Sequence, residues 1–421
     1  MTLPRLNPFV PDFVADPYRT GARYQAEEPV HWGEAAMSHL PGAWYVFRYA
    51  DAESVLDDAR FCRESARARG DNSGIPVPPQ FKEFRALVQN WLVFRDPPHH
   101  RRLRSLVTKA FTPMSIDQLR PTITALSQQL IDELQGDEEL DLVNTFALPL
   151  PVMVIASMLG VAGSDFPEFR RWSLALLDAS SSRLKPTPEA FTRAEEASRS
   201  FVEYFTREVA ARRTSPRDDL ISALTRARDE EDRLSDDEII ATCVHLLTSG
   251  HETTVNLIAK GVMTLATRPQ EIEWMLDQPS RTPRVVEELL RFDSPVQLVT
   301  RWAAEDVDLG GKSIRRGELV NVMLGLANRD PLRFSSASEF DPRRGESKHL
   351  VFGKGIHFCL GAALARMEGE IAFRQLFLKY PGLQVPNQDI PWTGSLVFHG
   401  PKHLKVRLGR STERNQQRSK P

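Results

Sequence analysis

Apolar residues recur at three- and four-residue spacing over much of the chain beyond about residue 98, which is the periodicity of helices that bury one face. The run WYVF at 44–47 instead combines aromatic and β-branched residues and predicts a strand. Residues 65–90 are polar and proline-bearing, so we expect a loop there. Helices are predicted at 115–135, 145–160, 164–180 and 188–212, with a hairpin tip at 180–188.

One predicted helix is much longer than the others. Ser235 and Glu238 form a capping-box pattern, in which the serine caps a free N–H and the glutamate reaches back. Apolar residues then dominate to Thr267, and Pro269 cannot continue a helix. About 30 residues at 1.5 Å each span roughly 45 Å, the width of a domain. Because this helix is apolar on nearly every side, we expect it to run through the core.

The composition is that of a globular protein with few cysteines. Of 421 residues, 41% are hydrophobic and 26% charged, which is too apolar for a disordered chain. The net charge of −2 argues against a general nucleic-acid binder, and no apolar run of about 18 residues predicts a membrane span. Cys62, Cys243 and Cys359 are too far apart for a disulfide framework or a cysteine zinc site, so we expect a cytoplasmic protein.

The sharpest local signal is the segment 352–368, where three glycines surround one cysteine just before a helix-forming run. Glycine adopts backbone conformations closed to other residues and lets a flat ligand approach closely. Cys359 near a helix N-terminus favours the thiolate, because the helix dipole stabilises negative charge. A lone cysteine is more often a buried structural residue, and the glycine frame weighs against that alternative.

The pattern F-G-x-G-x-H-x-C-x-G at 352–361 resembles the haem-binding loop of the cytochromes P-450, the haem-thiolate monooxygenases, at every fixed position. The resemblance covers most of the chain. It implies a single P-450 domain over 1–421, mainly α with small β-sheets (α+β), in which a long central helix lies over a haem; we expect a flexible tail at 412–421. The implied cofactor is haem b (iron protoporphyrin IX), with the Cys359 thiolate as axial iron ligand and Phe352 and Gly361 beside it.

The motif SGHETT in the long helix resembles the family's oxygen-binding motif, with Ser249 where the family has alanine or glycine. Gly250 has no side chain, so the helix is expected to be narrower there and able to kink where a ligand fits. The resemblance assigns Glu252 and Thr253 as the catalytic acid–alcohol pair that delivers protons for the splitting of dioxygen. Without Cys359, a threonine bonded to its own helix and a solvated glutamate would be the simpler interpretation.

Glu288 and Arg291 match the family's E-x-x-R, and at this spacing they share one helix face and can pair. An isolated pair of this kind would be weak evidence. Here it precedes the cysteine by about 70 residues, as in the family. The resemblance implies that Arg343, in the run FDPRR, completes a buried ionic cluster with this pair. That cluster would be structural and would not be catalytic.

Four cations match family positions that hold the haem carboxylates. The run DPPHHRRLR resembles D-P-P-x-H-x-x-x-R and gives His100 and Arg104, and the others are Arg301 and His357. Arginine suits carboxylates because its donors match two oxygens at once. Each residue alone would more often be a solvated charge.

The long helix also predicts a substrate chamber. His245, Ser249 and Thr253 are spaced by four and share one face, and a polar stripe on a buried helix must face partners or a cavity. We expect His245 to contact a polar substrate group, with a hydrogen bond to a backbone carbonyl as the alternative. The resemblance places four more residues in the pocket wall: Val296, Val299, Leu396 and Val397.

The implied reaction inserts one oxygen atom from O2 into a small organic substrate, by C–H hydroxylation or epoxidation. The substrate class we favour is a natural product such as a polyketide, macrolide or terpenoid. A peroxide-driven peroxygenase on the same fold and a non-catalytic haem-binding protein are the alternatives. The Glu252–Thr253 pair argues against both.

Electrons are expected from NAD(P)H through a separate ferredoxin or flavodoxin-type donor and its reductase. The chain has no dinucleotide-binding fingerprint and too few cysteines for an iron–sulfur cluster. A basic patch for an acidic donor is expected from Arg101, Arg102, Lys109 and Arg366. We further expect a monomer that binds neither nucleic acid nor a membrane.

Overall fold

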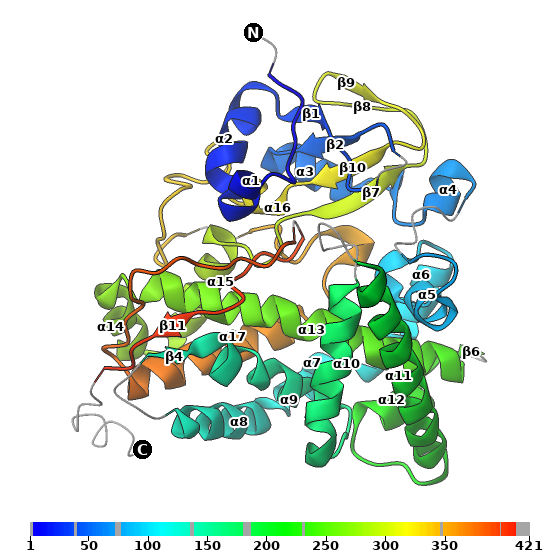
Figure 1. Ribbon diagram of the computed structural model, residues 1–421, viewed down its shortest axis with the longest axis vertical. Coiled ribbons are helices and arrows are strands. Elements are labelled where there is room, and N and C mark those ends of the chain that lie inside the picture. Colours follow the sequence, from blue (N-terminus) through cyan, green and yellow to red (C-terminus); the bar gives the residue numbers. More distant parts are fainter. Residues whose placement is uncertain are drawn as a thin grey trace.

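Helices make up most of the molecule, and its largest sheet lies at one end (Figure 1). The computed structural model describes residues 3–409 except 38–39, 72–76, 135–138, 180–186, 230–231, 346–347 and 396. The tail expected at 412–421 and most of the hairpin tip expected at 180–188 therefore lie outside the described residues. The mainly α architecture with small sheets confirms the predicted fold class. No helix in the described part of the chain is both long and apolar enough to cross a membrane.

The α-helices are α1 (Pro11–Ala15), α2 (Pro17–Glu27), α3 (Tyr49–Asp57), α4 (Ser65–Arg69), α5 (Lys82–Gln89), α6 (His99–Ala110), α7 (Pro113–Asp117), α8 (Arg120–Glu133), α9 (Pro149–Met158), α10 (Phe166–Asp178), α11 (Pro188–Thr214), α12 (Leu220–Arg226), α13 (Asp236–Leu265), α14 (Pro269–Asp277), α15 (Thr282–Phe292), α16 (Leu324–Ala327) and α17 (Ala362–Lys379). Shorter helical turns are η1 (Leu92–Phe94), η2 (Val143–Ala147), η3 (Gly163–Asp165), η4 (Pro279–Arg281) and η5 (Gly355–His357).

The strands are β1 (Val30–Gly33), β2 (Ala43–Val46), β3 (Phe61–Cys62), β4 (Leu140–Asp141), β5 (Arg228–Asp229), β6 (Asp232–Arg233), β7 (Val299–Ala303), β8 (Val307–Leu309), β9 (Lys312–Ile314), β10 (Leu319–Val322) and β11 (Lys405–Val406). The five-stranded sheet has the order β1-β2-β10-β7-β3. Only β2 and β10 run parallel within it, and its other pairs are antiparallel. The strand predicted at 44–47 is confirmed as β2, one residue earlier.

Helix α13 crosses the middle of the molecule and organises the helical part (Figure 1). Its predicted capping box is present: the Glu238 amide donates to Ser235 Oγ, and the Ser235 amide donates to a Glu238 carboxylate oxygen at 2.9 Å. Most of its side chains are buried, and it packs against α9, α11 and α17. The helix ends at Leu265, two residues before the expected Thr267.

The polar segment 65–90, expected to be a loop, contains two helices. Helix α5 forms because Phe84, Leu87 and Val88 recur at helical spacing and bury one face, which packs against α11. The central residues 72–76 lie outside the described part. The helix predicted at 115–135 is divided into α7 and α8, whose first turn holds Pro121.

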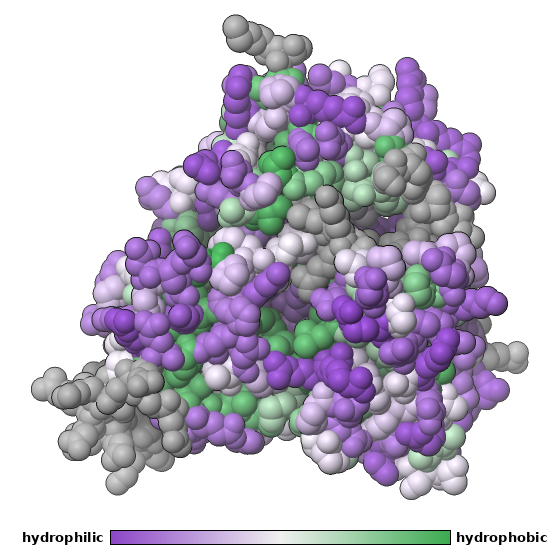
Figure 2. Space-filling model, viewed as in Figure 1, coloured by the Kyte–Doolittle hydropathy of each residue, from purple (hydrophilic) through white to green (hydrophobic). Residues whose placement is uncertain are grey.

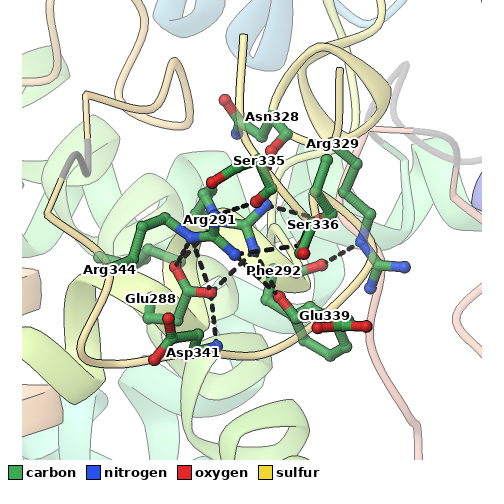
Figure 3. Close-up of polar contacts among 12 residues, drawn as sticks. Glu288, Arg291, Phe292, Asn328, Arg329, Ser335, Ser336, Glu339, Asp341 and Arg344 are labelled. Carbon is green, nitrogen blue, oxygen red and sulfur yellow. Dashed lines mark hydrogen bonds and ion pairs between the residues drawn. The ribbon is translucent and has the colours of Figure 1, made fainter. Parts of the chain in front are cut away.

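A buried ionic cluster fixes the turns that follow α15 (Figure 3). The Arg291 guanidinium makes two hydrogen bonds of 2.8 Å to the Glu288 carboxylate. It also donates to the backbone carbonyls of Asn328, Ala337 and Glu339 at 2.8–2.9 Å. Both side chains are buried. The pair therefore differs from the exposed, weakly stabilising ion pair that its i, i+3 spacing alone would indicate.

The third cation of this cluster is Arg344, and the prediction of Arg343 was wrong. Arg344 lies 3.4 Å from Glu288 and donates to the Ser335 and Ser336 carbonyls (Figure 3). Its side chain is 8% exposed, whereas that of Arg343 is 46% exposed and binds Glu271 at 2.6 Å. The Asp341–Arg344 turn points the two neighbouring side chains in different directions. A sequence pattern cannot distinguish two adjacent arginines in such a turn.

Replacing the two arginines separately tests this assignment. We expect Arg344→Ala to lower the free energy of unfolding by about 2 kcal/mol, because Glu288 loses a buried cationic partner. The matched variant Arg343→Ala breaks a partly exposed ion pair with Glu271 and a cation–π contact with Trp274, and should cost no more than about 1 kcal/mol. Urea unfolding followed by circular dichroism measures both. Equal losses, or a larger loss for Arg343→Ala, would contradict the assignment.

Candidate functional site

A cavity of about 480 Å³ lies between α13 and the cysteine segment. Figure 2 shows apolar side chains in a recess at the level of α13, on a face otherwise covered mainly by polar ones. The predicted site residues that line the cavity are His100, Arg104, His245, Ser249, Gly250, Thr253, Val296, Val299, Arg301, Phe352, His357, Cys359, Gly361 and Val397. Glu252 is buried and is not among the lining residues, and Leu396 lies outside the described residues.

The cysteine segment is a tight loop that holds Cys359 at the cavity. The Cys359 amide donates to the Phe352 carbonyl at 2.9 Å, which closes the loop. Gly353 and Gly355 have φ values of +70° and +66°, a region that favours glycine. A Cβ on Gly355 would also lie 3.0 Å from the Leu56 carbonyl oxygen. Helix α17 starts directly after Gly361, as the sequence predicts.

The surroundings of the Cys359 thiol act on its pKa in opposite directions. Burial raises the pKa, while a backbone hydrogen bond from Gly361 and the charges of Arg104 and Arg366 lower it. The Gly361 amide and the two cations stabilise the thiolate form. An added cationic centre facing Sγ, such as a metal ion, would stabilise that form further.

The predicted carboxylate-binding residues do come together at one side of the cavity. The rings of His100 and His357 lie 4.4 Å apart, and Arg104 and Arg301 line the same space. Burial lowers the pKa of Arg301 to about 9 and that of His357 to about 4. The His100 Nε2 atom is buried without a hydrogen-bond partner among the described residues. Buried donors and cations of this kind are stable only with a polar or anionic partner, so this part of the cavity fits a ligand with acidic groups.

Another part of the lining is the polar stripe of α13, arranged as the spacing predicts. Ser249 Oγ donates to the His245 carbonyl at 2.6 Å, and Thr253 Oγ1 donates to the Ser249 carbonyl at 3.2 Å. Their hydroxyl lone pairs therefore remain available to the cavity, which both residues line. Glu252 is buried on the next face of the helix, so the expected acid–alcohol pair does not face the cavity together.

Helix α13 is continuous through Gly250, and the kink expected there stays a prediction. Gly250 permits close helix packing: a Cβ there would lie 2.4 Å from Ile155 Cδ1 on α9. The glycine thus brings α9 against the cavity, which Ile155 also lines.

His245, the histidine of this polar stripe, is in its neutral form. Its ring stacks on Trp91, with centroids 5.1 Å apart and planes at 15°. Burial lowers its pKa to about 4, so it is uncharged at pH 7. No described residue hydrogen-bonds to its ring nitrogens, which removes the alternative of a carbonyl-bound histidine within the described part of the chain.

Many cavity residues were not predicted from the sequence, among them Arg63, Trp91, Phe94 and Glu368. Trp91 and Phe94 stack at the turn η1, and only their i, i+3 spacing just before the DPP motif signalled a shared face. The position of Arg63 at the cavity depends on the pairing of β3 with β7, which the sequence does not reveal. Glu368 ends the cysteine segment, but nothing in the sequence indicates that its carboxyl is buried.

Glu368 lies on α17 and is 1% exposed. Burial raises its pKa to about 8, so the carboxyl is protonated at neutral pH. One of its oxygens has no hydrogen-bond partner among the described residues. Ionising this group inside the folded chain is therefore costly.

Glu368→Gln should make the protein less sensitive to alkaline pH. The folded pKa lies above the unfolded value of 4.5, so this carboxyl lowers stability as the pH rises through that interval toward 8. The amide cannot ionise, and the stability advantage of the variant should grow by on the order of 1–2 kcal/mol between pH 6 and pH 8. Urea unfolding at both pH values measures it, with the exposed Glu196→Gln on α11 as control. An advantage that stays constant or shrinks as the pH rises would refute the buried neutral acid.

Comparisons with known proteins agree with this site. A family model described as Cytochrome P450 matches residues 44–405. The 6-deoxyerythronolide B hydroxylase of Saccharopolyspora erythraea is 38% identical over 405 residues, 94% of this chain and 97% of the relative. The mycinamicin IV hydroxylase/epoxidase of Micromonospora griseorubida is 39% identical over 370 residues, 86% of this chain and 89% of the relative.

The same fold is found in a solved structure, the cytochrome P450 PksS of the bacillaene polyketide synthase of Bacillus subtilis 168. It has a TM-score of 0.87 and 34% sequence identity, and the match covers 96% of this chain and 100% of that one. Family match, sequence identity and fold extend over nearly the whole chain. The chain therefore belongs to the cytochrome P450 family of monooxygenases.

Proposed function

We propose that this protein inserts one oxygen atom from O2 into a neutral, largely apolar natural product, with haem b held by the Cys359 thiolate. The observation that carries the proposal is the cavity itself, with Cys359 on one wall and Thr253 of α13 on another. When bound, the haem supplies dioxygen activation, which a thiolate ligand favours.

The residues present fit a haem. Its two carboxylates would be held by His100, Arg104, Arg301 and His357, whose buried donors line one side of the cavity. Phe352 and the Gly353–Gly355 backbone form the loop that lets a flat ring approach Cys359. The Gly361 amide lowers the basicity of the sulfur by hydrogen bonding.

Protons would reach the cavity through α13. Thr253 Oγ1 faces the cavity and can accept a hydrogen bond there, while its own proton goes to the Ser249 carbonyl. Glu252 is the acid nearest to it along the chain and is buried behind the cavity wall. We assign Glu252 to proton supply. We assign Thr253 to accepting the hydrogen bond that holds the incoming proton at the cavity.

The substrate class follows from the chamber's lining and from the relatives. The lining is mainly apolar, and beyond the carboxylate-binding side its polar groups include the hydroxyls of α13, the neutral His245, Tyr45, Asn321 and the protonated Glu368. Such a chamber suits a bulky neutral molecule with a few hydroxyl or carbonyl groups. Two relatives are named for the oxidation of macrolides, and a polyketide, macrolide or terpenoid remains our proposed class.

The electron donor is proposed to be a separate ferredoxin or flavodoxin-type protein driven by NAD(P)H. Three of the four residues expected to form the basic patch for this donor have bonding partners within the chain. Arg102 binds Asp232 and Glu238, Arg366 binds Glu287, and Lys109 donates to the Arg228 carbonyl. Arg101 and Lys109 are the exposed members. The monomeric state and the cytoplasmic location stay predictions.

Thr253→Ala tests the reaction. With a surrogate ferredoxin, its reductase and a substrate that shifts the haem spectrum, the wild-type chain should couple NAD(P)H consumption to product carrying one atom of labelled O2. We expect coupling in the variant to fall roughly tenfold or more, with electrons diverted to hydrogen peroxide, because the proton is no longer held at the cavity. Thr264→Ala, on the same helix but away from the cavity, is the matched control.

Two results would contradict this reaction. Turnover by the wild-type chain with hydrogen peroxide alone, and none with NAD(P)H and redox partners, would favour the peroxygenase alternative. Ligand binding without any substrate-dependent electron consumption would favour the non-catalytic alternative.

His245→Phe tests the polar contact to substrate. Phenylalanine keeps a ring to stack on Trp91 but removes both ring nitrogens. For a hydroxylated macrolactone, we expect the dissociation constant from spectral titration to rise about fivefold to tenfold, the range of one lost hydrogen bond. The control is His99→Phe, an exposed histidine at the start of α6. Unchanged affinity and unchanged site of oxidation would rule out this contact.

A further inference from the structure

Arg63 follows strand β3 and lies opposite Arg301 in the sheet. Strands β3 and β7 are antiparallel, with Phe61 paired to Ala303 and Cys62 to Trp302. One residue further, this register places Arg63 across from Arg301. Like charges directly opposite one another destabilise a sheet, so this position requires a compensating group.

Both arginines line the same cavity, Arg301 buried and Arg63 partly buried. Burial lowers the pKa of Arg63 to about 10, and the Arg63 charge itself contributes to the lowered pKa of Arg301. Arg63 Nε donates to the Val93 carbonyl, and Nη1 donates to the Thr300 hydroxyl at 2.7 Å. These bonds aim the guanidinium along the cavity wall that Arg301 also lines.

The nearby carboxylate offsets this pair only in part: the charge of Asp96 raises the pKa of both guanidinium groups, but its hydrogen bonds go to backbone amides. Asp96 accepts hydrogen bonds from the backbone amides of Arg63 and Glu64 at 2.8 and 2.7 Å, and its other oxygen lies 3.8 Å from His357 Nε2. Among the described residues, neither Arg63 nor Arg301 forms an ion pair with a carboxylate. Arg301 is buried and Arg63 is partly buried, and two such guanidinium groups without a bonded anion fit an anionic ligand.

We infer that Arg63 and Arg301 form an arginine clamp, in which both guanidinium groups bind one carboxylate of the haem. This inference rests on the proposed function, because it assumes that haem occupies the cavity. Guanidinium groups bind carboxylate oxygens two at a time, and Arg63 Nη2 is not committed to any hydrogen bond with the described residues. The clamp adds Arg63 to the four residues that the family motifs assign.

A carboxylate in this cavity has two possible sources, the haem itself or an acidic substrate. The haem is favoured because Arg63, Arg301 and His357 line the same cavity, Asp96 accepts the Arg63 amide and lies 3.8 Å from His357 Nε2, and His357 belongs to the cysteine loop. A substrate is expected instead along the hydroxyl stripe of α13. The two sources are separated by a porphyrin whose carboxylates are blocked.

The test measures porphyrin retention, independently of turnover. Chains loaded with haem or with haem dimethyl ester are mixed with excess apomyoglobin, and the rate of porphyrin transfer is recorded for wild type, Arg63→Gln, Arg63→Lys and Arg67→Gln. We expect Arg63→Gln to accelerate the loss of haem roughly tenfold, as for a lost charge-assisted hydrogen bond, and the loss of the ester less than twofold. Arg63→Lys keeps the charge but loses the paired donors of the guanidinium, and should accelerate haem loss less than Arg63→Gln does. Arg67, exposed in α4, is the matched control.

Three results would overturn the clamp. An equal acceleration for haem and its ester would mean that Arg63 only shapes the loop after β3. Unchanged haem retention in Arg63→Gln, with weaker binding of palmitate as a carboxylate probe, would assign the anion to the substrate. If the wild-type chain retains neither porphyrin, the proposed function fails and the clamp with it, whereas wild-type retention without any effect of Arg63 refutes the clamp alone.

Discussion

The structure depends on one constraint: a single sulfur must be held still at the wall of a buried cavity and kept negatively charged. The loop that carries Cys359 meets the first requirement by backbone conformation, with two glycines at positive φ and a hydrogen bond that closes the loop on Phe352. Gly361, Arg104 and Arg366 each lower the pKa of the thiol, but burial outweighs them and the net pKa is raised, so the second requirement also needs a cationic centre facing Sγ. The ionic cluster of Glu288, Arg291 and Arg344 fixes the preceding turns in the same part of the fold.

The cavity has two chemically distinct sides, and this division accounts for its two kinds of ligand. One side gathers buried cations and histidines with little opposing acid, which fits the acidic groups of a porphyrin. The other side is the stripe of α13, whose hydroxyls are bonded to their own helix and whose histidine is neutral. A charged cofactor and an uncharged substrate can therefore share one chamber without competing for the same groups.

The sequence predicted correctly those features that depend only on a few neighbouring residues. The capping box of Ser235 and Glu238 and the glycine frame of Cys359 are each contained in a few residues, and both were predicted correctly. Features decided by contacts between distant segments were missed. Arg344 takes the place expected for Arg343 because of a turn, Gly250 makes room for Ile155 of another helix, and Arg63 meets Arg301 only through strand register. Helix α5 forms inside a polar, proline-bearing segment because its apolar face packs on α11.

The central claim is that Cys359 binds the iron of a haem as a thiolate, and the spectrum of the reduced protein under carbon monoxide tests it most directly. The account predicts a strongly red-shifted Soret band in the wild-type chain, as expected when a thiolate lies opposite carbon monoxide, and loss of that band in Cys359→His. A wild-type band at the shorter wavelength of a histidine-ligated haem, or a red-shifted band that persists in Cys359→His, would contradict the account.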